Sequence, residues 1–259
     1  MIMIPLIPWI FLFLTGICVG SFLNVCIYRI PQEESIVFGP SHCMSCGHKL
    51  GWVDLVPVFS FLFLRGRCRY CKAALSFQYP LIEATNALLW LFCYYRFGDR
   101  IDTLIACGLS SILLVLSVID ARTQIIPLGC NIGIALLAVL SLILPIGTAS
   151  MEKLLFHLLG AVAVSGFLLL ILLFTGGEGI GGGDVKLMAA AGLLLGFPGI
   201  VIAFLIGCIA GTILHLIRMV CFHAGRRLAL GPYLSLGIFM TLLYGEDLLN
   251  WYLGLLGIR

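Results

Sequence analysis

The chain has 259 residues, of which 61% are hydrophobic and only 10% are charged, and its formal net charge is +3. A soluble domain carries about 25% charged residues, so this composition excludes an ordinary soluble protein and indicates a polytopic membrane protein. The small net charge gives no support for nucleic-acid binding. No basic residue precedes the first apolar segment, which argues against a cleavable signal peptide.

The apolar segments predict about eight membrane-spanning helices, because a spanning helix needs about 20 apolar residues. In chain order the segments are 4–27, 80–97, 102–119, 126–147, 153–175, 185–197, 199–221 and 232–256. The sixth is short, and Pro198 with Gly199 marks either a turn after it or a kink within one long helix. We therefore expect an all-α polytopic fold, divided into a first transmembrane helix (1–27), a cytoplasmic insertion (28–79) and a transmembrane core of about seven helices (80–259).

Basic residues gather on one side of this arrangement. With the N-terminus outside, the inner loops hold Arg29, Lys49, Arg65, Arg67, Arg69, Lys72, Arg122, Lys186, Arg218, Arg226 and Arg227. The outer loops hold Arg96, Arg100, Lys153 and Arg259. Cytoplasmic loops are enriched in Lys and Arg, so the N-terminus is predicted to lie outside. Asp120 and Asp184 then both lie at cytoplasmic helix ends.

The insertion carries two C-x-x-C pairs, Cys43 with Cys46 and Cys68 with Cys71. Two such pairs at this separation are typical of a tetrahedral zinc site. Four thiolates leave no open coordination position, which indicates a structural metal rather than a hydrolytic one. A redox dithiol or a disulfide is the alternative, but disulfides are rare in cytoplasmic loops.

Two histidines, His42 and His48, flank the first cysteine pair. Because four cysteines already complete a tetrahedral site, we interpret both histidines as bystanders. The thiolates would also offset most of the positive charge of the insertion, so a nucleic-acid-binding zinc ribbon is not expected.

Two aspartates border apolar segments. Asp120 ends one, and Asp184 follows the glycines 181–183 and precedes another. Asp184 alone is compatible with a helix N-cap. Asp120 is harder to explain structurally, because a helix C-terminus disfavours a carboxylate and residues i and i+2, here Arg122, do not face each other. Together they suggest an acid–base pair, in which one carboxylate takes a proton from water while its protonated partner polarises a peptide carbonyl.

Four motifs in order resemble the type IV prepilin peptidases, a family of Gly-x-Gly-Asp membrane aspartyl proteases. They are Gly20-Ser21-Phe22-Leu23-Asn24-Val25 with Tyr28-Arg29-Ile30-Pro31, the four cysteines with Arg65-Gly66-Arg67-Cys68-Arg69 and Tyr79-Pro80-Leu81-Ile82-Glu83, Asp120 with Ile126-Pro127, and Glu178-Gly179-Ile180 followed by Gly181-Gly182-Gly183-Asp184-Val185-Lys186-Leu187. The resemblance covers residues 16 to about 196.

The resemblance implies an eight-helix aspartyl protease of the bacterial inner membrane. Such enzymes cut the leader from type IV prepilins or pseudopilins at the cytoplasmic face. Asp120 and Asp184 would form the protease dyad, and the four cysteines would hold Zn²⁺. Members with this insertion typically also methylate the new N-terminus with S-adenosylmethionine. The sequence holds no glycine-rich nucleotide loop after a strand, so no residues of a methyl-donor site can be derived from it.

Two positions depart from the family pattern. Leu128 stands where many relatives have Asp or Asn, and Leu55 stands where Asn is common. Neither belongs to the dyad. Glu83 could attract a basic leader or hold an interfacial Arg or Lys, and Lys186 could contact lipid headgroups or tune the dyad.

Three alternatives to a bifunctional enzyme are open. A peptidase without methyl transfer fits the same motifs. A proton-coupled transporter would need the acids near the bilayer midplane rather than at helix ends. A zinc-bearing scaffold would leave Asp120 unexplained.

Overall fold

The computed structural model describes residues 6–144, 151–177, 179–222, 228–255 and 257. Glu178 of the fourth motif and Arg226, Arg227 and Arg259 of the charge pattern lie outside these residues. Within them the elements are helices, and the only β-type pairs are two isolated bridges in the insertion. The all-α prediction is therefore confirmed. The chain forms two compact units, Met1–Val115 and Leu116–Arg259.

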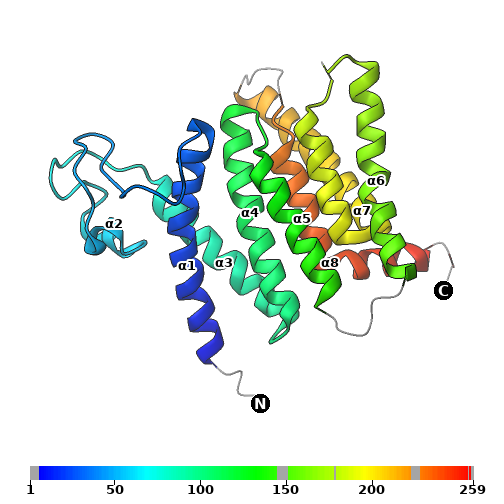
Figure 1. Cartoon of the computed structure of the whole chain (residues 1–259), viewed down its shortest axis with the longest axis horizontal. Coiled ribbons are helices and arrows are strands. Elements are labelled where there is room, and N and C mark those ends of the chain that lie inside the picture. The colour runs from blue at the N-terminus through cyan, green and yellow to red at the C-terminus, as the bar shows by residue number, and fades with distance from the viewer. Residues whose placement is uncertain (1–5, 145–150, 178, 223–227, 256, 258–259) are drawn as a thin grey trace. The chain divides into compact units, whose positions relative to one another are not determined.

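The first unit consists of two long helices and the insertion that joins them (Figure 1). Its elements are α1 (Leu6–Arg29), η1 (Ile30–Gln32), η2 (Trp52–Leu55), α2 (Phe59–Phe63), α3 (Gln78–Phe97) and the first part of α4 (Ile101–Thr123). Helix α1 packs along α3, and a Cβ at Gly16 would lie 2.8 Å from the Cα of Ala87. A Cβ at Gly20 would lie 2.6 Å from the Cα of Glu83. Glycine at both positions therefore lets the two backbones touch.

A buried hydrogen-bond chain fixes the helices of this unit. The Asn86 side chain donates to the Gly16 carbonyl at 2.8 Å and accepts from the Ser111 hydroxyl at 2.8 Å. The same hydroxyl accepts from the indole N–H of Trp90 at 3.0 Å. Because an unpaired polar group in apolar surroundings is costly, this network selects one register of α1, α3 and the first part of α4.

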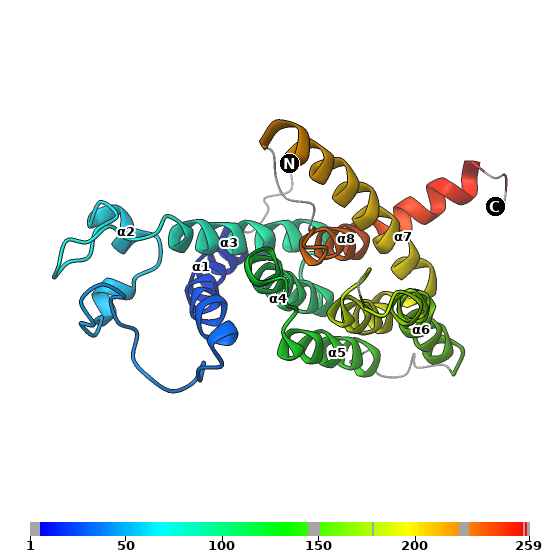
Figure 2. The same ribbon diagram turned by 90° about the horizontal axis from the view of Figure 1, so that it is seen from above.

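The second unit is organised around α7, which contacts three other helices (Figure 2). Its elements are the end of α4, α5 (Leu128–Ile143), α6 (Met151–Phe174), α7 (Gly182–Phe222) and α8 (Gly231–Leu255). Helix α7 packs against α5, α6 and α8. A Cβ at Gly192 would overlap the backbone at Gly160 of α6, and one at Gly237 of α8 would overlap Ala203. Small residues in this unit thus allow the close helix packing that is typical of membranes.

Helix α7 is sharply kinked at Gly196, whose φ of 74° and ψ of 178° are not helical. Before the kink α7 runs antiparallel to α6, since Gly182 lies beside Leu172 and Gly192 beside Gly160. After it the direction is reversed, because the Phe204 ring contacts Phe167, further along α6 than Gly160. The break expected near Pro198 is therefore a reversal of the chain two residues earlier, and the two limbs correspond to the segments 185–197 and 199–221.

Four helices of the described residues are long and apolar enough to cross a membrane. They are Leu6–Gln32, Ile101–Thr123, Met151–Phe174 and Gly182–Cys221, and a shorter apolar helix covers Leu128–Ile143. Helices α3 and α8 do not meet this standard of length and hydropathy. Eight complete spans therefore stay a prediction.

Candidate active site and metal centre

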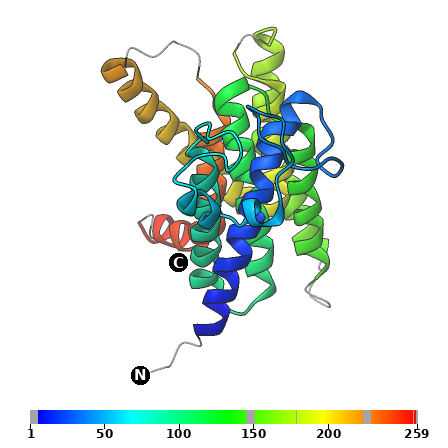
Figure 3. The same cartoon turned by 90° about the vertical axis from the view of Figure 1, so that its left-hand side faces the viewer.

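The insertion lies against α1 and the start of α3 (Figure 3) and holds the four predicted cysteines in two turns of matching structure. In each turn the backbone N–H of the first cysteine donates to the residue five positions on, and its carbonyl accepts from the residue four positions on. The bonds are Cys43 N to His48 O (2.9 Å), Gly47 N to Cys43 O (2.8 Å), Cys68 N to Ala73 O (2.8 Å) and Lys72 N to Cys68 O (3.1 Å). Each turn needs a positive φ, which Gly47 adopts at 70° and Lys72 at 61°.

The four sulfur atoms are close enough together to share one metal ion. All lie within 4.8 Å of one another, and the Sγ atoms of Cys43 and Cys71 are 3.8 Å apart. A tetrahedral zinc ion with Zn–S bonds of about 2.3 Å requires sulfur separations of about 3.8 Å. The backbone N–H groups of Cys46 and Ser45 lower the pKa of the Cys43 thiol to about 6, which favours the thiolate that binds metal.

The cysteines are free rather than paired in disulfides. The group of possible metal ligands contains neither His42 nor His48. The His48 ring instead stacks on Tyr70, with 3.6 Å between the ring centroids. The cluster can thus hold a metal ion with sulfur ligands alone.

Asp54 joins the segment that follows the first cysteine turn to the second turn. Its Oδ1 lies 2.7 Å from Nε of Arg69, in the second turn. Its Oδ2 accepts from the Gly51 N–H at 3.1 Å and from the Tyr70 hydroxyl at 3.3 Å. The Asp54 side chain is only 6% exposed. It therefore holds the second turn against the chain segment between the two turns.

In the second unit, Asp120 lies at the end of α4 and points at the start of α8. Its side chain is buried, and its Oδ2 accepts from the Gly231 N–H at 2.9 Å. A Cβ at Gly231 would lie 2.7 Å from this oxygen, so only glycine fits there. The carboxylate thus lies at the positive end of the α8 dipole, although it ends its own helix.

Asp184 lies in the first turn of α7 and is half-buried. Its carboxylate lies beside the Gly181 backbone at the helix start. Asp184 is the third residue of the helix rather than its N-cap. A capping role and a chemical role are therefore compatible for this side chain.

Asp120 and Asp184 both belong to the second unit and lie near enough for the charge of Asp120 to act on the carboxylate of Asp184. No hydrogen bond joins the two carboxyl groups, both of which the structure describes. The Asp120 carboxylate accepts one backbone N–H at the start of α8, and the Asp184 carboxylate lies in the first turn of α7, so both keep acceptor positions for water or a substrate.

Two glycines, Gly183 and Gly231, allow the backbone to approach closely at these two sites. A Cβ at Gly183 would lie 2.9 Å from the Cβ of Ile126, so the glycine lets α7 approach the Ile126-Pro127 segment after α4. Gly231 was not predicted from the sequence. Its only signal is its place immediately before Pro232, at the start of the last apolar segment.

Of the remaining singled-out residues, Leu128 and Lys186 belong to the second unit and Glu83 belongs to the first. Leu128 and Lys186 are exposed. Glu83 is buried rather than interfacial, and its Oε2 accepts from the Val58 N–H at 2.6 Å. No ion pair with Glu83 is present among the described residues, so the expected Arg or Lys partner is not found.

Comparisons with known proteins cover both units. The Bacterial Peptidase A24 N-terminal domain matches residues 14–97, which include the four cysteines. The Type IV leader peptidase family matches residues 107–216, which include both aspartates. No solved structure matches the chain.

Curated relatives match over almost the full length. A "Prepilin leader peptidase/N-methyltransferase" of Aeromonas salmonicida (strain A449) is 31% identical, over 95% of this chain and 95% of the relative. A protein of the same name from Bacillus subtilis (strain 168) is 32% identical, over 93% of this chain and 96% of the relative. One from Xanthomonas campestris is 32% identical over 94% of both. The chain is an integral membrane protein that belongs to the type IV prepilin leader peptidase family.

Proposed function

We propose that this chain is a membrane-embedded aspartyl endopeptidase that removes the leader peptide from type IV prepilins or pseudopilins. The observation that supports the proposal is that Asp120 and Asp184, which lie beside the starts of α8 and α7, are near enough for their charges to interact. The curated relatives are named for the same activity. The substrate would be a membrane protein whose apolar segment lies against these helices.

The proposed reaction needs only the two carboxyl groups and water. Neighbouring carboxylates resist carrying two full charges, so the pair holds one proton. The ionised member takes a proton from water, and the protonated member donates a hydrogen bond to the scissile carbonyl. The water oxygen attacks the carbonyl carbon, and the proton then passes to the leaving amine. The helix starts that face Asp120 and Asp184 stabilise the negative charge that the pair carries.

A second activity is proposed for the first unit. The relatives carry "N-methyltransferase" in their names, and we infer that this chain methylates the new N-terminus after cleavage. S-adenosylmethionine would supply an electrophilic methyl group from its sulfonium. We assign cleavage to the core 80–259. We assign methyl transfer to the insertion 28–79, which follows the first helix 1–27, together with the helix ends beside the insertion.

Zinc is the metal that the four cysteines fit best. Their sulfur separation matches tetrahedral Zn–S geometry, and four thiolates leave no position for a reactive water. We therefore propose that zinc folds the insertion and takes no part in cleavage. The proposed setting is the bacterial inner membrane with about eight membrane-crossing segments, the N-terminus outside and the aspartates at the cytoplasmic face.

Cleavage of a prepilin in reconstituted vesicles tests the peptidase. Asp120→Asn and Asp184→Asn should each lower the rate by at least about a hundredfold, since each removes one proton-transfer group. Asn can still accept the backbone N–H at each site, so folding should be kept. Asp102→Asn, in the same helix as Asp120 but paired with Arg100 at 2.7 Å, is the matched control. Normal cleavage by either of the first two variants would exclude the dyad.

A further inference from the structure

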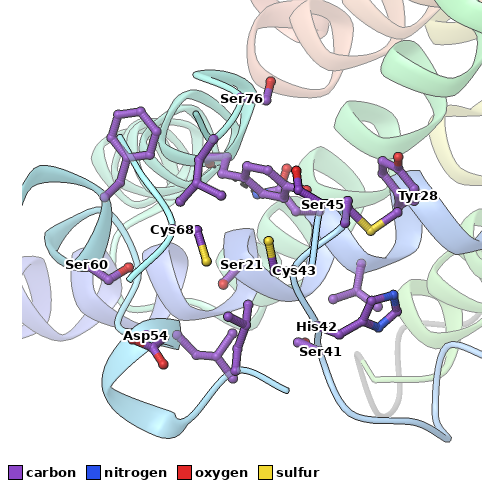
Figure 4. Close-up of a pocket in the computed structure, with 18 of the residues that line it drawn as sticks. Ser21, Tyr28, Ser41, His42, Cys43, Ser45, Asp54, Ser60, Cys68 and Ser76 are labelled. Atoms are coloured by element: carbon purple, nitrogen blue, oxygen red, sulfur yellow. Dashed lines mark hydrogen bonds between the residues drawn. The ribbon is translucent and has the colours of Figure 1, made fainter. Parts of the chain in front are cut away.

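The first unit contains a cavity of about 430 Å³ that no sequence motif predicted. Its walls come from α1, the start of α3 and the insertion, and Figure 4 shows Ser21, Cys43 and Cys68 among the side chains around it. Sites for small ligands have volumes of about 300–1,000 Å³. The cavity is therefore large enough for a small molecule or for the end of a peptide chain.

Most charged groups around this cavity already have partners. The Arg29 guanidinium donates to four backbone carbonyls between residues 35 and 40, at 3.0 to 3.3 Å. Arg69 is paired with Asp54. Glu83 differs, because its side chain is 6% exposed and the described residues place no cation beside it. A buried carboxylate without a counter-charge therefore faces the cavity.

The contacts of Glu83 leave part of its carboxylate unused. Its Oε2 accepts from the Val58 N–H, and the Ser21 hydroxyl lies near the carboxylate. An ionised carboxylate offers about four acceptor positions, so this bond does not exhaust it. Val58 has a φ of 60°, a conformation that is strained for a β-branched residue. Such strained backbone is often found at ligand sites.

Asn24, in the wall of the same cavity, supplies a second unused acceptor. Its Nδ2 donates to the carbonyls of Tyr79 (3.1 Å) and Gly20 (3.4 Å). The residue is only 5% exposed, and its buried Oδ1 has no hydrogen-bond partner among the described residues. Gly20, one helical turn before Asn24, packs directly on Glu83. A buried acceptor of this kind is costly unless a ligand provides a donor.

We propose that Glu83 and Asn24 bind the free α-ammonium group of the processed substrate, and so position it for methyl transfer. A primary ammonium carries only donors and a compact positive charge, which complements one unpaired carboxylate and one unpartnered amide oxygen. The Glu83 carboxylate would then also accept one proton from the bound ammonium. That proton's departure leaves the nitrogen lone pair that a methyl acceptor needs. The identity of the occupant rests on the proposed second activity, whereas the demand for a cationic donor does not.

Binding of two small probes to the purified, zinc-loaded full chain tests this proposal. The probes are leucinamide, which has a free ammonium, and N-acetyl-leucinamide, which is neutral at the same position. Titration calorimetry in detergent should show that leucinamide binds at least about tenfold more tightly, as expected for a charge-assisted hydrogen bond. Glu83→Gln should abolish this preference while keeping an oxygen for the Val58 N–H. Glu34→Gln, at an exposed residue that also lines the cavity, should leave it unchanged.

The outcomes distinguish the two possible sources of the cation, which are the ammonium group of the substrate and the methyl donor. Equal binding of the two probes to the unmodified protein would overturn the proposal. It would also be overturned if Glu83→Gln kept the preference for leucinamide but lost binding of S-adenosylmethionine, because the carboxylate would then serve the methyl donor.

Zinc content and the thermal unfolding midpoint show whether Glu83→Gln is folded. If that variant cannot be purified, Glu83→Asp keeps the charge but moves it back by one methylene, and should reduce the preference; an unchanged preference would contradict the proposal. Prepilin cleavage by the unmodified protein is measured in parallel. A failure of cleavage would contradict the proposed peptidase and leave the binding result standing.

Discussion

In the first unit the candidate metal centre is built from two short turns, whereas in the second unit the candidate active site is built from helix ends that are far apart in the chain. Each cysteine turn is closed by hydrogen bonds between residues four or five positions apart. Asp120, in contrast, bonds to Gly231, 111 positions later. The first site thus depends on local chain geometry and a metal, and the second depends on the packing of several helices. Changes in one unit should therefore affect the two activities differently.

The largest expected effect is the loss of cleavage without loss of methyl transfer. Asp184→Asn should reduce prepilin cleavage by at least about a hundredfold. Methyl transfer to a prepilin supplied already cleaved should stay close to that of the unmodified protein, because the first unit does not contain Asp184. Incorporation of a labelled methyl group measures this directly. Equal loss of both activities would show that the two sites are not separable in this way.

The reverse effect is expected from the metal centre. Cys68→Ser should remove bound zinc and the methyl transfer that depends on a folded insertion, since structural zinc supplies folding free energy. Cleavage should fall by less than about tenfold, as no residue of the aspartate pair lies in the insertion. Metal analysis and the two activity assays provide the measurements. Cys18→Ser, at an exposed cysteine of α1, is the control and should keep its zinc.

An intermediate effect is expected at the helix start that holds Asp120. Gly231→Ala puts a methyl group 2.7 Å from the Asp120 Oδ2, so the carboxylate or α8 must move. We expect cleavage to fall by about tenfold and the free energy of unfolding to drop by about 1–3 kcal/mol. In the same helix, a Cβ at Gly254 would have no atom within 4 Å. Gly254→Ala should therefore change neither the cleavage rate nor the free energy of unfolding. Comparable activity of the two variants would argue against a fixed position for Asp120.

The smallest effect is expected from the ion pair between Asp54 and Arg69 of the second cysteine turn. Asp54→Asn removes the charge that faces Arg69 but can still accept from the Gly51 N–H. Because the Arg69 side chain is 45% exposed, solvent screening should limit the loss. Zinc release to a chelator should become a few times faster, followed by an indicator dye. Zinc release at the original rate would indicate that the ion pair does not contribute to holding the metal.

The same contrast explains how much could be predicted from the sequence. The cysteine cluster was predictable in full, because C-x-x-C spacing places both sulfurs of a pair in one turn. The two aspartates could be predicted from the sequence, because a carboxylate beside a membrane-spanning segment is energetically costly. Their hydrogen-bond partners could not be predicted. Nothing near Asp120 in the chain indicates Gly231, and the hydrogen bond depends on the packing of α4 and α8.

Two further features were open for a similar reason. Pro198 and Gly199 were compatible with a turn or a kink. The chain reverses at Gly196, which has a positive φ and where a Cβ would lie 2.9 Å from the Phe156 ring of α6. The cavity beside Glu83 needed the approach of α1 and α3 at Gly20. The sequence pattern of glycine-rich nucleotide loops could not reveal this cavity, because the walls of the cavity come from three separate segments.

The reversal at Gly196 also has a consequence for the lipid around the protein. The limb of α7 from Gly182 to Leu195 that carries Asp184 has fourteen residues, and a helix of this size is about 21 Å long. The hydrocarbon core of a bilayer is about 30 Å thick, so this limb is shorter than its surroundings. Hydrophobic mismatch of this kind is relieved by local thinning of the bilayer. Water and a peptide bond would then reach the carboxylates at a smaller depth, and cleavage should be faster in vesicles of short-chain lipids than in vesicles of long-chain lipids.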